Sequence, residues 1–169
     1  VEDAVPTETR NKVLQFLEEK TEEFTSLGNR DVLYFGEYDY HYTGKKHEAK
    51  ETPLVIQELL DDIRPHLTKR NTWLNSCLIT RYKDRESHIP KHSDNEAAID
   101  PESVIVTASF GAERKIEFTC PRSNEEKCLI LKDNSVYTMT RDSQEYWQHE
   151  IPPLSASDQQ VESLDNVVR

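Results

Sequence analysis

The chain has 169 residues and is strongly acidic, with 21 Lys and Arg residues against 32 Asp and Glu residues and a formal net charge of −11. This length predicts a single domain with a real core, and 31% charged residues indicate a very polar globular protein. We expect no membrane span and no secretory leader, because no long apolar run occurs. The charge argues against a protein held to nucleic acid by a broad basic surface.

The three cysteines lack the number and spacing of a disulfide scaffold or a zinc site, so we expect a reducing, intracellular compartment, cytoplasmic or nuclear. They are Cys77, Cys120 and Cys128. The chain begins at Val1 without an initiator Met, and we therefore expect a piece of a larger polypeptide. We also expect it to be a monomer.

The N-terminal third predicts two helices with a strand between them. Apolar residues recur at helical spacing over residues 9–27, which favours a first helix. A second helix is expected over 53–64, with Pro53 in its first turn and Pro65 after its end. The aromatic stretch 34–44 is typical of a strand that runs into an exposed loop.

The remainder of the chain predicts short strands separated by turns, including a hairpin turn at 111–113. The candidate strands are 73–82, 103–109, 114–119, 128–131, 135–139 and 147–151. Helices followed by many short strands indicate an α+β, mainly β fold, a sandwich or barrel buttressed by the N-terminal helices.

A candidate metal site comes from two segments. His92 and Asp94 are separated by one residue, so in a strand their side chains point to the same face. His149 follows after several predicted strands, which can return it beside that pair. Two imidazoles and one carboxylate form the facial triad of non-haem Fe(II) oxygenases. Zinc hydrolysis can use similar ligands, but it would need an additional general base that the sequence does not single out.

Several motifs in order resemble those of the AlkB-like Fe(II)/2-oxoglutarate dioxygenases. They are residues 74–84, 92–96, 109–118, 135–139 and 144–152. The resemblance implies a double-stranded β-helix, or jelly roll, with an N-terminal helical segment at 1–30 and a dioxygenase domain at 31–169. The family pattern continues beyond residue 169, so we expect this domain to be truncated at its C-terminus.

The resemblance also implies which residues bind the cofactors. Fe(II) is expected on His92, Asp94 and His149. The co-substrate 2-oxoglutarate is expected on Tyr82, on Thr80, and on Arg169, whose guanidinium would pair with the distant carboxylate. Thr80 stands where the family commonly has Asn, and one hydroxyl donor predicts weaker co-substrate binding.

On the substrate side, Glu96 lies where the family contacts the target base. Three alternating tyrosines, Tyr38, Tyr40 and Tyr42, are expected in a lid that stacks on an extruded base, although such tyrosines can equally be cross-strand packing. The implied activity is oxidative removal of N-methyl groups, of the 1-methyladenine and 3-methylcytosine type, from RNA or single-stranded DNA. It consumes O₂ and releases succinate, CO₂ and formaldehyde.

Two alternatives stay open: a 2-oxoglutarate-dependent hydroxylase or demethylase of a protein, which an acidic surface suits, and a non-catalytic interaction domain. The charge is uneven along the chain. Residues 69–91 are rich in Lys and Arg, whereas 92–169 carry most of the acidic excess. A short phosphate track beside His92 is therefore expected, with salt-sensitive, short-footprint binding of nucleic acid.

Overall fold

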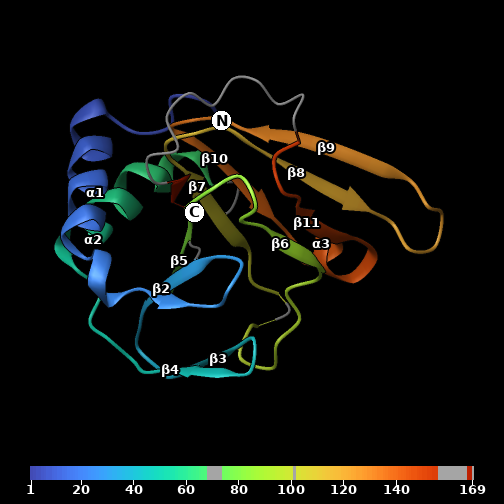
Figure 1. Cartoon of the computed structure of the whole chain (residues 1–169), viewed down its shortest axis with the longest axis horizontal. Helices are drawn as coiled ribbons and strands as arrows, with labels where there is room; N and C mark the ends of the chain where they lie inside the picture. Colours follow the sequence, from blue (N-terminus) through green and yellow to red (C-terminus); the bar gives the residue numbers. More distant parts are fainter. Residues whose placement is uncertain (68–73, 101, 156–166, 169) are drawn as a thin grey trace.

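The structure is a computed structural model that describes residues 1–67, 74–100, 102–155 and 167–168. The two N-terminal helices cover one side of a β-sandwich, and a long two-stranded arm projects from the other side (Figure 1). The helical elements are α1 (Thr7–Glu19), η1 (Thr21–Glu23), α2 (Leu54–Ile63), η2 (Arg64–His66) and α3 (Arg141–Tyr146). None of the helices in these ranges is long and apolar enough to cross a membrane.

Twelve strands are found in the described ranges. They are β1 (Thr25–Ser26), β2 (Asp31–Gly36), β3 (Tyr40–Tyr42), β4 (Lys45–His47), β5 (Ser76–Tyr82), β6 (Ile89–His92), β7 (Ile105–Ser109), β8 (Arg114–Thr119), β9 (Glu126–Leu131), β10 (Ser135–Met139), β11 (Gln148–Ile151) and β12 (Val167–Val168). They pair in the orders β1-β2-β5-β12, β10-β7, β6-β11-β8-β9 and β3-β4. This arrangement confirms the mainly β jelly roll with N-terminal helices.

The first helix is shorter than its sequence pattern predicts. It ends at Glu19 and is followed by η1 and β1, so the prediction of one helix over 9–27 is wrong beyond that residue. Thr25 and Ser26 pair with the start of β2 instead, and strand pairing with a neighbour outweighs local helix propensity. The second helix is confirmed within one residue at each end, with Pro53 as its N-cap.

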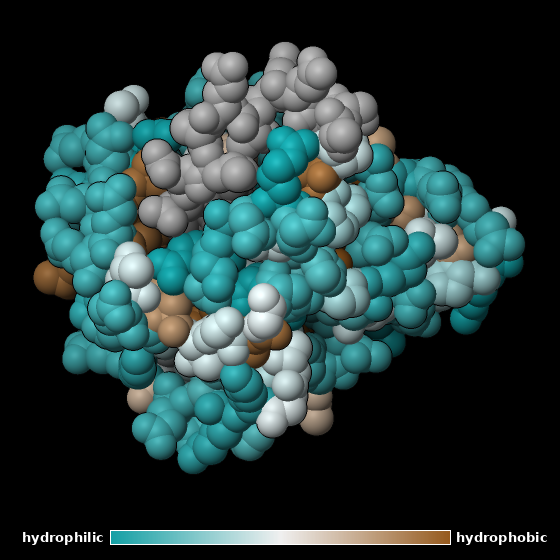
Figure 2. All heavy atoms as spheres, viewed as in Figure 1, coloured by the Kyte–Doolittle hydropathy of each residue, from teal (hydrophilic) through white to brown (hydrophobic). Residues whose placement is uncertain are grey.

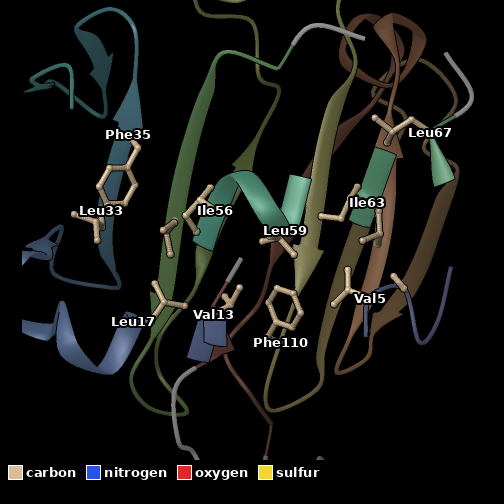
Figure 3. Close-up of a cluster of buried hydrophobic side chains, with 13 residues drawn as sticks. Val5, Val13, Leu17, Leu33, Phe35, Ile56, Leu59, Ile63, Leu67 and Phe110 are labelled. Atoms are coloured by element: carbon tan, nitrogen blue, oxygen red, sulfur yellow. The ribbon is translucent and has the colours of Figure 1, made fainter. Parts of the chain in front are cut away.

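The main apolar core lies between the helices and the strands they cover, not inside the sandwich (Figure 3). Its buried members include residues of both helices and of β2, β5 and β10: Val13, Leu17, Leu33, Phe35, Ile56, Leu59, Ile63, Ile79 and Val136. Each such side chain contributes about 1.5–3 kcal/mol when fully buried. Helix α1 and strand β2 contribute side chains to the same core, so apolar contacts cross the expected domain boundary at residue 30. That boundary stays a prediction.

A smaller cluster fills the interior between the sheets. It contains Tyr82, Ile116, Leu131 and Ile151, with Phe118 packed against it. Side chains alternate along β5, so Thr80 and Tyr82 share one face while Ile79 and Arg81 share the other. Because Tyr82 belongs to the interior cluster and Ile79 to the helix-facing core, Thr80 and Tyr82 face the inside of the jelly roll.

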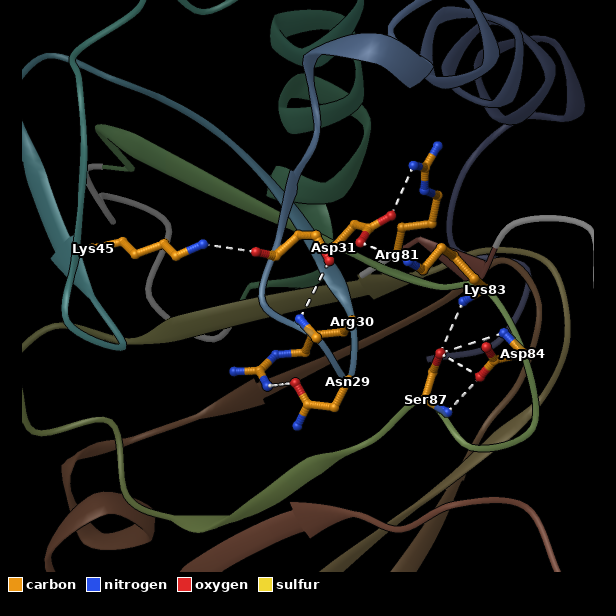
Figure 4. A network of polar contacts seen from close by, with 10 residues as sticks. Asn29, Arg30, Asp31, Lys45, Arg81, Lys83, Asp84 and Ser87 are labelled. Carbon is orange, nitrogen blue, oxygen red and sulfur yellow. Dashed lines mark hydrogen bonds and ion pairs between the residues drawn. The ribbon is translucent and has the colours of Figure 1, made fainter.

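Three basic residues in the described part of the segment before His92 pair with carboxylates of the protein. Arg81 and Lys83 both contact the Asp31 carboxylate, at 2.9 and 3.0 Å, in a polar network on β2 and β5 (Figure 4). Lys91 pairs with Glu150 at 3.2 Å. These ion pairs reduce the local positive charge, and the short phosphate track expected beside His92 stays a prediction. The face seen in Figure 2 is mostly hydrophilic, with scattered apolar atoms.

Candidate metal centre and its surroundings

Two histidines from distant parts of the chain meet on neighbouring strands. Strands β6 and β11 run antiparallel, and their register places His92 directly opposite His149. The two ring centroids are 4.3 Å apart. The register shifts after His149, so the strands pair irregularly beyond the histidines. The pairing of β6 with β11 therefore brings together the two histidines that the sequence suggested as ligands.

Asp94 lies just past the end of β6 and completes the cluster. Its Oδ1 is 3.2 Å from His92 Nε2, and its Oδ2 is 3.5 Å from His149 Nε2. One ligand atom from each of the three side chains lies within 4.8 Å of the other two. Asp94 and His92 are partly exposed, whereas His149 is buried. Access from solvent is therefore on the side of Asp94 and His92.

The orientation of His92 suits a metal ligand. Its Nδ1 lies 2.8 Å from the Pro90 carbonyl oxygen, and this nitrogen must carry the proton and donate to that carbonyl. Nε2 faces Asp94, and it is the nitrogen that can bind a metal after it releases the proton shared with that carboxylate. Metal-binding histidines commonly donate their second nitrogen to a carbonyl or carboxylate in this way.

The electrostatics favour a positive charge between these groups. Burial lowers the pKa of His149 to about 4, so its imidazole is neutral at pH 7, as a metal ligand must be. Burial alone would raise the pKa of Asp94, but the hydrogen bond with His92 and both imidazoles lower it. Burial likewise would lower the pKa of His92, but Asp94 raises it. The cluster therefore favours an ionised carboxylate beside a bound proton or cation.

Helix α3 holds the Asp94 loop in place through contacts that the sequence did not reveal. The Asp94 backbone N–H donates to Gln144 Oε1 at 2.8 Å, and Gln144 Nε2 lies 3.4 Å from Asp94 Oδ2. Ser93 Oγ donates to the Trp147 carbonyl oxygen at 2.9 Å. No spacing rule predicts these pairs, because α3 and the loop are brought together only by strand pairing.

Arg114 is a second residue that sequence reasoning did not single out. Its side chain is fully buried, and its guanidinium lies over the Tyr82 ring at 5.0 Å. It donates to the Pro152 carbonyl oxygen at 3.0 Å and to the Ser87 carbonyl oxygen. Arg114 thereby connects β8 with the segment after β5, the strand that carries Tyr82. It also connects β8 with the segment after β11, the strand that carries His149.

The residues expected near a substrate differ in their surroundings. Tyr38 is 70% exposed. Tyr40 stacks between Tyr34 and Tyr42, with centroid distances of 5.4 and 5.9 Å. Tyr42 is buried and accepts a hydrogen bond from Arg30 at 2.8 Å. These contacts make Tyr42 a packing residue, so its expected role in stacking on a base is not supported by its position.

Glu96 lies beside this tyrosine layer. Burial raises the pKa of Tyr40, and so do the charges of Glu96 and Asp94 and the hydrogen bond to Glu96. Glu96 Oε2 is buried and has no hydrogen-bond partner among the described residues. Tyr40 and Glu96 therefore border the metal cluster, and one buried carboxylate oxygen remains available to a donor.

Comparison with known proteins agrees with this geometry. The family model of the 2OG-Fe(II) oxygenase superfamily matches residues 7–167. The chain belongs to this superfamily. Human DNA oxidative demethylase ALKBH2 is 27% identical over 163 residues, which cover 84% of this chain and 62% of that protein. The mouse alpha-ketoglutarate-dependent dioxygenase alkB homolog 3 is 26% identical over 140 residues, covering 78% and 48%.

The fold has a solved counterpart. The structure of OsALKBH1 matches with a TM-score of 0.65 and 9% identity, covering 99% of this chain and 93% of that chain. This 2OG-Fe(II) oxygenase is therefore AlkB-like in sequence and in fold. It spans less than two thirds of the length of the two curated relatives named above.

The cofactors of the superfamily are Fe(II) and 2-oxoglutarate, and the cluster fits iron. Two borderline imidazoles and one hard carboxylate match the Fe(II) facial triad, and His92 already presents the required nitrogen. For 2-oxoglutarate, Thr80 and Tyr82 are buried on the interior face of β5. The expected third contact, Arg169, lies outside the described residues.

Proposed function

We propose that His92, Asp94 and His149 bind Fe(II) and that this oxygenase demethylates N-methylated bases in RNA or single-stranded DNA. The observation that carries the proposal is the convergence of the three side chains, with ligand atoms within 4.8 Å of one another. When bound, iron and 2-oxoglutarate, with O₂ as the oxidant, would supply the chemistry that hydroxylates a C–H bond and decarboxylates the co-substrate.

The protein's own groups have separate roles in this proposal. His92, Asp94 and His149 hold the metal, while Tyr82 and Thr80, on the interior face of β5, donate hydrogen bonds to 2-oxoglutarate. Arg169 pairs with the distant carboxylate of the co-substrate, as a bidentate guanidinium can. Arg114 supports Tyr82 through the contact of its guanidinium with the ring face at 5.0 Å.

Glu96 favours a base with an exocyclic amine. Its Oε2 is buried without a partner among the residues described, and a buried acceptor costs free energy unless a donor reaches it. The amines of 1-methyladenine and 3-methylcytosine are such donors, whereas a keto group is not. Glu96 and Tyr40 would therefore orient the base at the metal centre, and the exposed ring of Tyr38 would stack on it or on a neighbouring base.

The charge distribution supports a short nucleic-acid footprint. Arg81 and Lys83 share the Asp31 carboxylate, and Lys91 pairs with Glu150, so the positive charge that these three residues offer to phosphates is reduced. Recognition of an extruded base then supplies most of the affinity.

We also propose that the protein works as a monomeric domain of a larger polypeptide inside the cell.

The test is turnover with defined oligonucleotides. The protein is incubated with Fe(II), 2-oxoglutarate, ascorbate and single-stranded RNA or DNA that carries 1-methyladenine or 3-methylcytosine, and bases and succinate are measured by mass spectrometry. We expect methyl loss matched by succinate. The Asp94→Asn variant should neither remove the methyl group nor form succinate. Asp61→Asn, which changes an exposed carboxylate in α2, should behave as wild type.

The other outcomes separate the remaining possibilities. A peptide, and not a methylated oligonucleotide, could stimulate succinate formation. This result would contradict the proposal and identify a protein hydroxylase instead, which the acidic surface also suits. Iron binding without any succinate would favour a non-catalytic domain. The proposal is contradicted if the wild-type protein binds no divalent metal.

A further inference from the structure

We infer that Gln144 is a positioning residue that holds the Asp94 carboxylate in the orientation needed to bind a divalent metal. The inference rests on the proposed role of Asp94 as a metal ligand. It assigns a function to α3, a short helix that the sequence analysis did not expect and that otherwise contributes no group to the centre.

The side chain of Gln144 contacts Asp94 at two points. Its carbonyl oxygen accepts from the Asp94 backbone N–H at 2.8 Å, and its amide nitrogen lies 3.4 Å from the carboxylate oxygen Oδ2. One amide thus restrains both the main chain and the side chain of the same residue. Rotation of the carboxylate away from the two imidazoles would break the second contact.

This restraint is needed because Asp94 is not held by a strand. Strand β6 ends at His92, and Asp94 lies in the loop that follows, where no ladder hydrogen bonds fix the backbone. A second contact between the same segments supports the arrangement, since Ser93 Oγ donates to the Trp147 carbonyl oxygen at 2.9 Å. His92 and His149, by contrast, lie opposite each other in a paired register.

The amide of Gln144 also fixes its own orientation. Its nitrogen lies 3.6 Å from Met139 Sδ on β10, besides its contact with Asp94. The amide cannot be reversed without placing its NH₂ group against the Asp94 N–H, which is a donor as well. The helix therefore presents an acceptor to the backbone and a donor to the carboxylate. Hydrogen-bond partners of metal ligands typically change metal affinity by about 10–100-fold when they are removed.

The test compares metal binding with folding. Gln144→Met removes both contacts while keeping a similar volume. We expect its Mn²⁺ dissociation constant, measured by calorimetry without 2-oxoglutarate, to rise about 10–100-fold. The visible absorption of the Co²⁺-loaded protein should change too, because the ligand geometry changes. The metal-free protein should stay folded at the assay temperature, with Tm lowered by no more than a few degrees. Glu145→Gln, on the exposed side of α3, is the matched control.

Two results would overturn the inference: a Mn²⁺ affinity of the folded variant within twofold of wild type, or an unchanged Co²⁺ spectrum. If Gln144→Met does not fold, Gln144→Asn replaces it, because the shorter amide cannot keep both contacts; affinity equal to wild type would then overturn the inference. A wild-type protein that binds no metal would instead contradict the proposed function.

Discussion

His92 and His149 face each other across antiparallel strands β6 and β11, with their ring centroids 4.3 Å apart. The pairing brings two imidazoles to one point without the cost of ordering loops, because each histidine is part of a strand. Asp94, in contrast, reaches the same point from a loop. The centre thus combines two rigid ligands with one that depends on neighbouring side chains for its position.

Replacing His149 should separate metal binding from stability. His149 is buried, contacts the Phe118 ring, and has a buried Nδ1 without a hydrogen-bond partner in the described part of the chain. We expect His149→Phe to lower Mn²⁺ affinity at least about 100-fold, while the metal-free protein melts at the same or a higher temperature because an unsatisfied polar atom is removed. Calorimetry and thermal melting check both expectations. His41→Phe, an exposed position on β3, is the control, and retained Mn²⁺ binding by His149→Phe would contradict the assignment.

Arg114 should be essential for stability. Removing its guanidinium leaves the carbonyl oxygens of Ser87 and Pro152 buried without their donor. We expect Arg114→Met to lower the free energy of unfolding by about 2–3 kcal/mol, because buried acceptors lose their hydrogen bonds from a charged donor. Urea unfolding followed by circular dichroism measures it. Lys115→Met, on the exposed side of β8, should change stability far less. A loss below about 1 kcal/mol for Arg114→Met would contradict the structure.

The Asp31 network should make stability depend on acid pH. Burial would raise the pKa of Asp31, but its hydrogen bonds and charge interactions with Arg81 and Lys83 lower it below the usual 3.8. As pH falls, the unfolded chain therefore binds the proton first, and the stabilisation is lost as pH passes down through the lowered pKa. Asp31→Asn should flatten this acid decline and be less stable near pH 7, because Arg81 then lacks its carboxylate.

Urea unfolding at pH values from 2 to 7 checks this expectation. Asp61→Asn is the control, because Asp61 is an exposed carboxylate at the end of α2 whose pair with Arg64 is long, at 3.7 Å. Its profile should follow the wild type. A profile for Asp31→Asn that parallels the wild type would show that Asp31 is not held ionised by its partners.

The tyrosines of the β2–β4 region should divide into two groups. Tyr38 is 70% exposed, so Tyr38→Ala should leave Tm unchanged and weaken binding of a methylated oligonucleotide about fivefold or more, since stacking on a base contributes about 1–3 kcal/mol. Tyr42→Phe removes the hydrogen bond from buried Arg30 and should destabilise the fold by about 1–2 kcal/mol. Fluorescence anisotropy and thermal melting distinguish them. Equal oligonucleotide affinity of Tyr38→Ala and wild type would remove Tyr38 from the substrate site.

Much of the fold followed from local patterns. The helix at α2 and the strands β5, β7, β8, β9, β10 and β11 were expected within a few residues of their observed bounds, because apolar periodicity and turn residues report which face of an element is buried. The end of α1 was not predicted, since Thr25 and Ser26 form a strand only through pairing with β2. Strand β6 and helix α3 were missed because both are short and carry few apolar residues.

The sequence by itself determined the chemical identity of the site. The residue types and spacing of His92, Asp94 and His149, with the surrounding motifs, were enough to predict an iron centre and the family. Only the tertiary structure decided what supports that centre: Gln144 beside Asp94, and Arg114 against the ring of Tyr82. It also decided that Arg81, Lys83 and Lys91 are paired and that Tyr42 is buried. The physical reason is that ligand types are a local property, whereas hydrogen-bond partners, ion pairs and burial depend on which strands lie side by side.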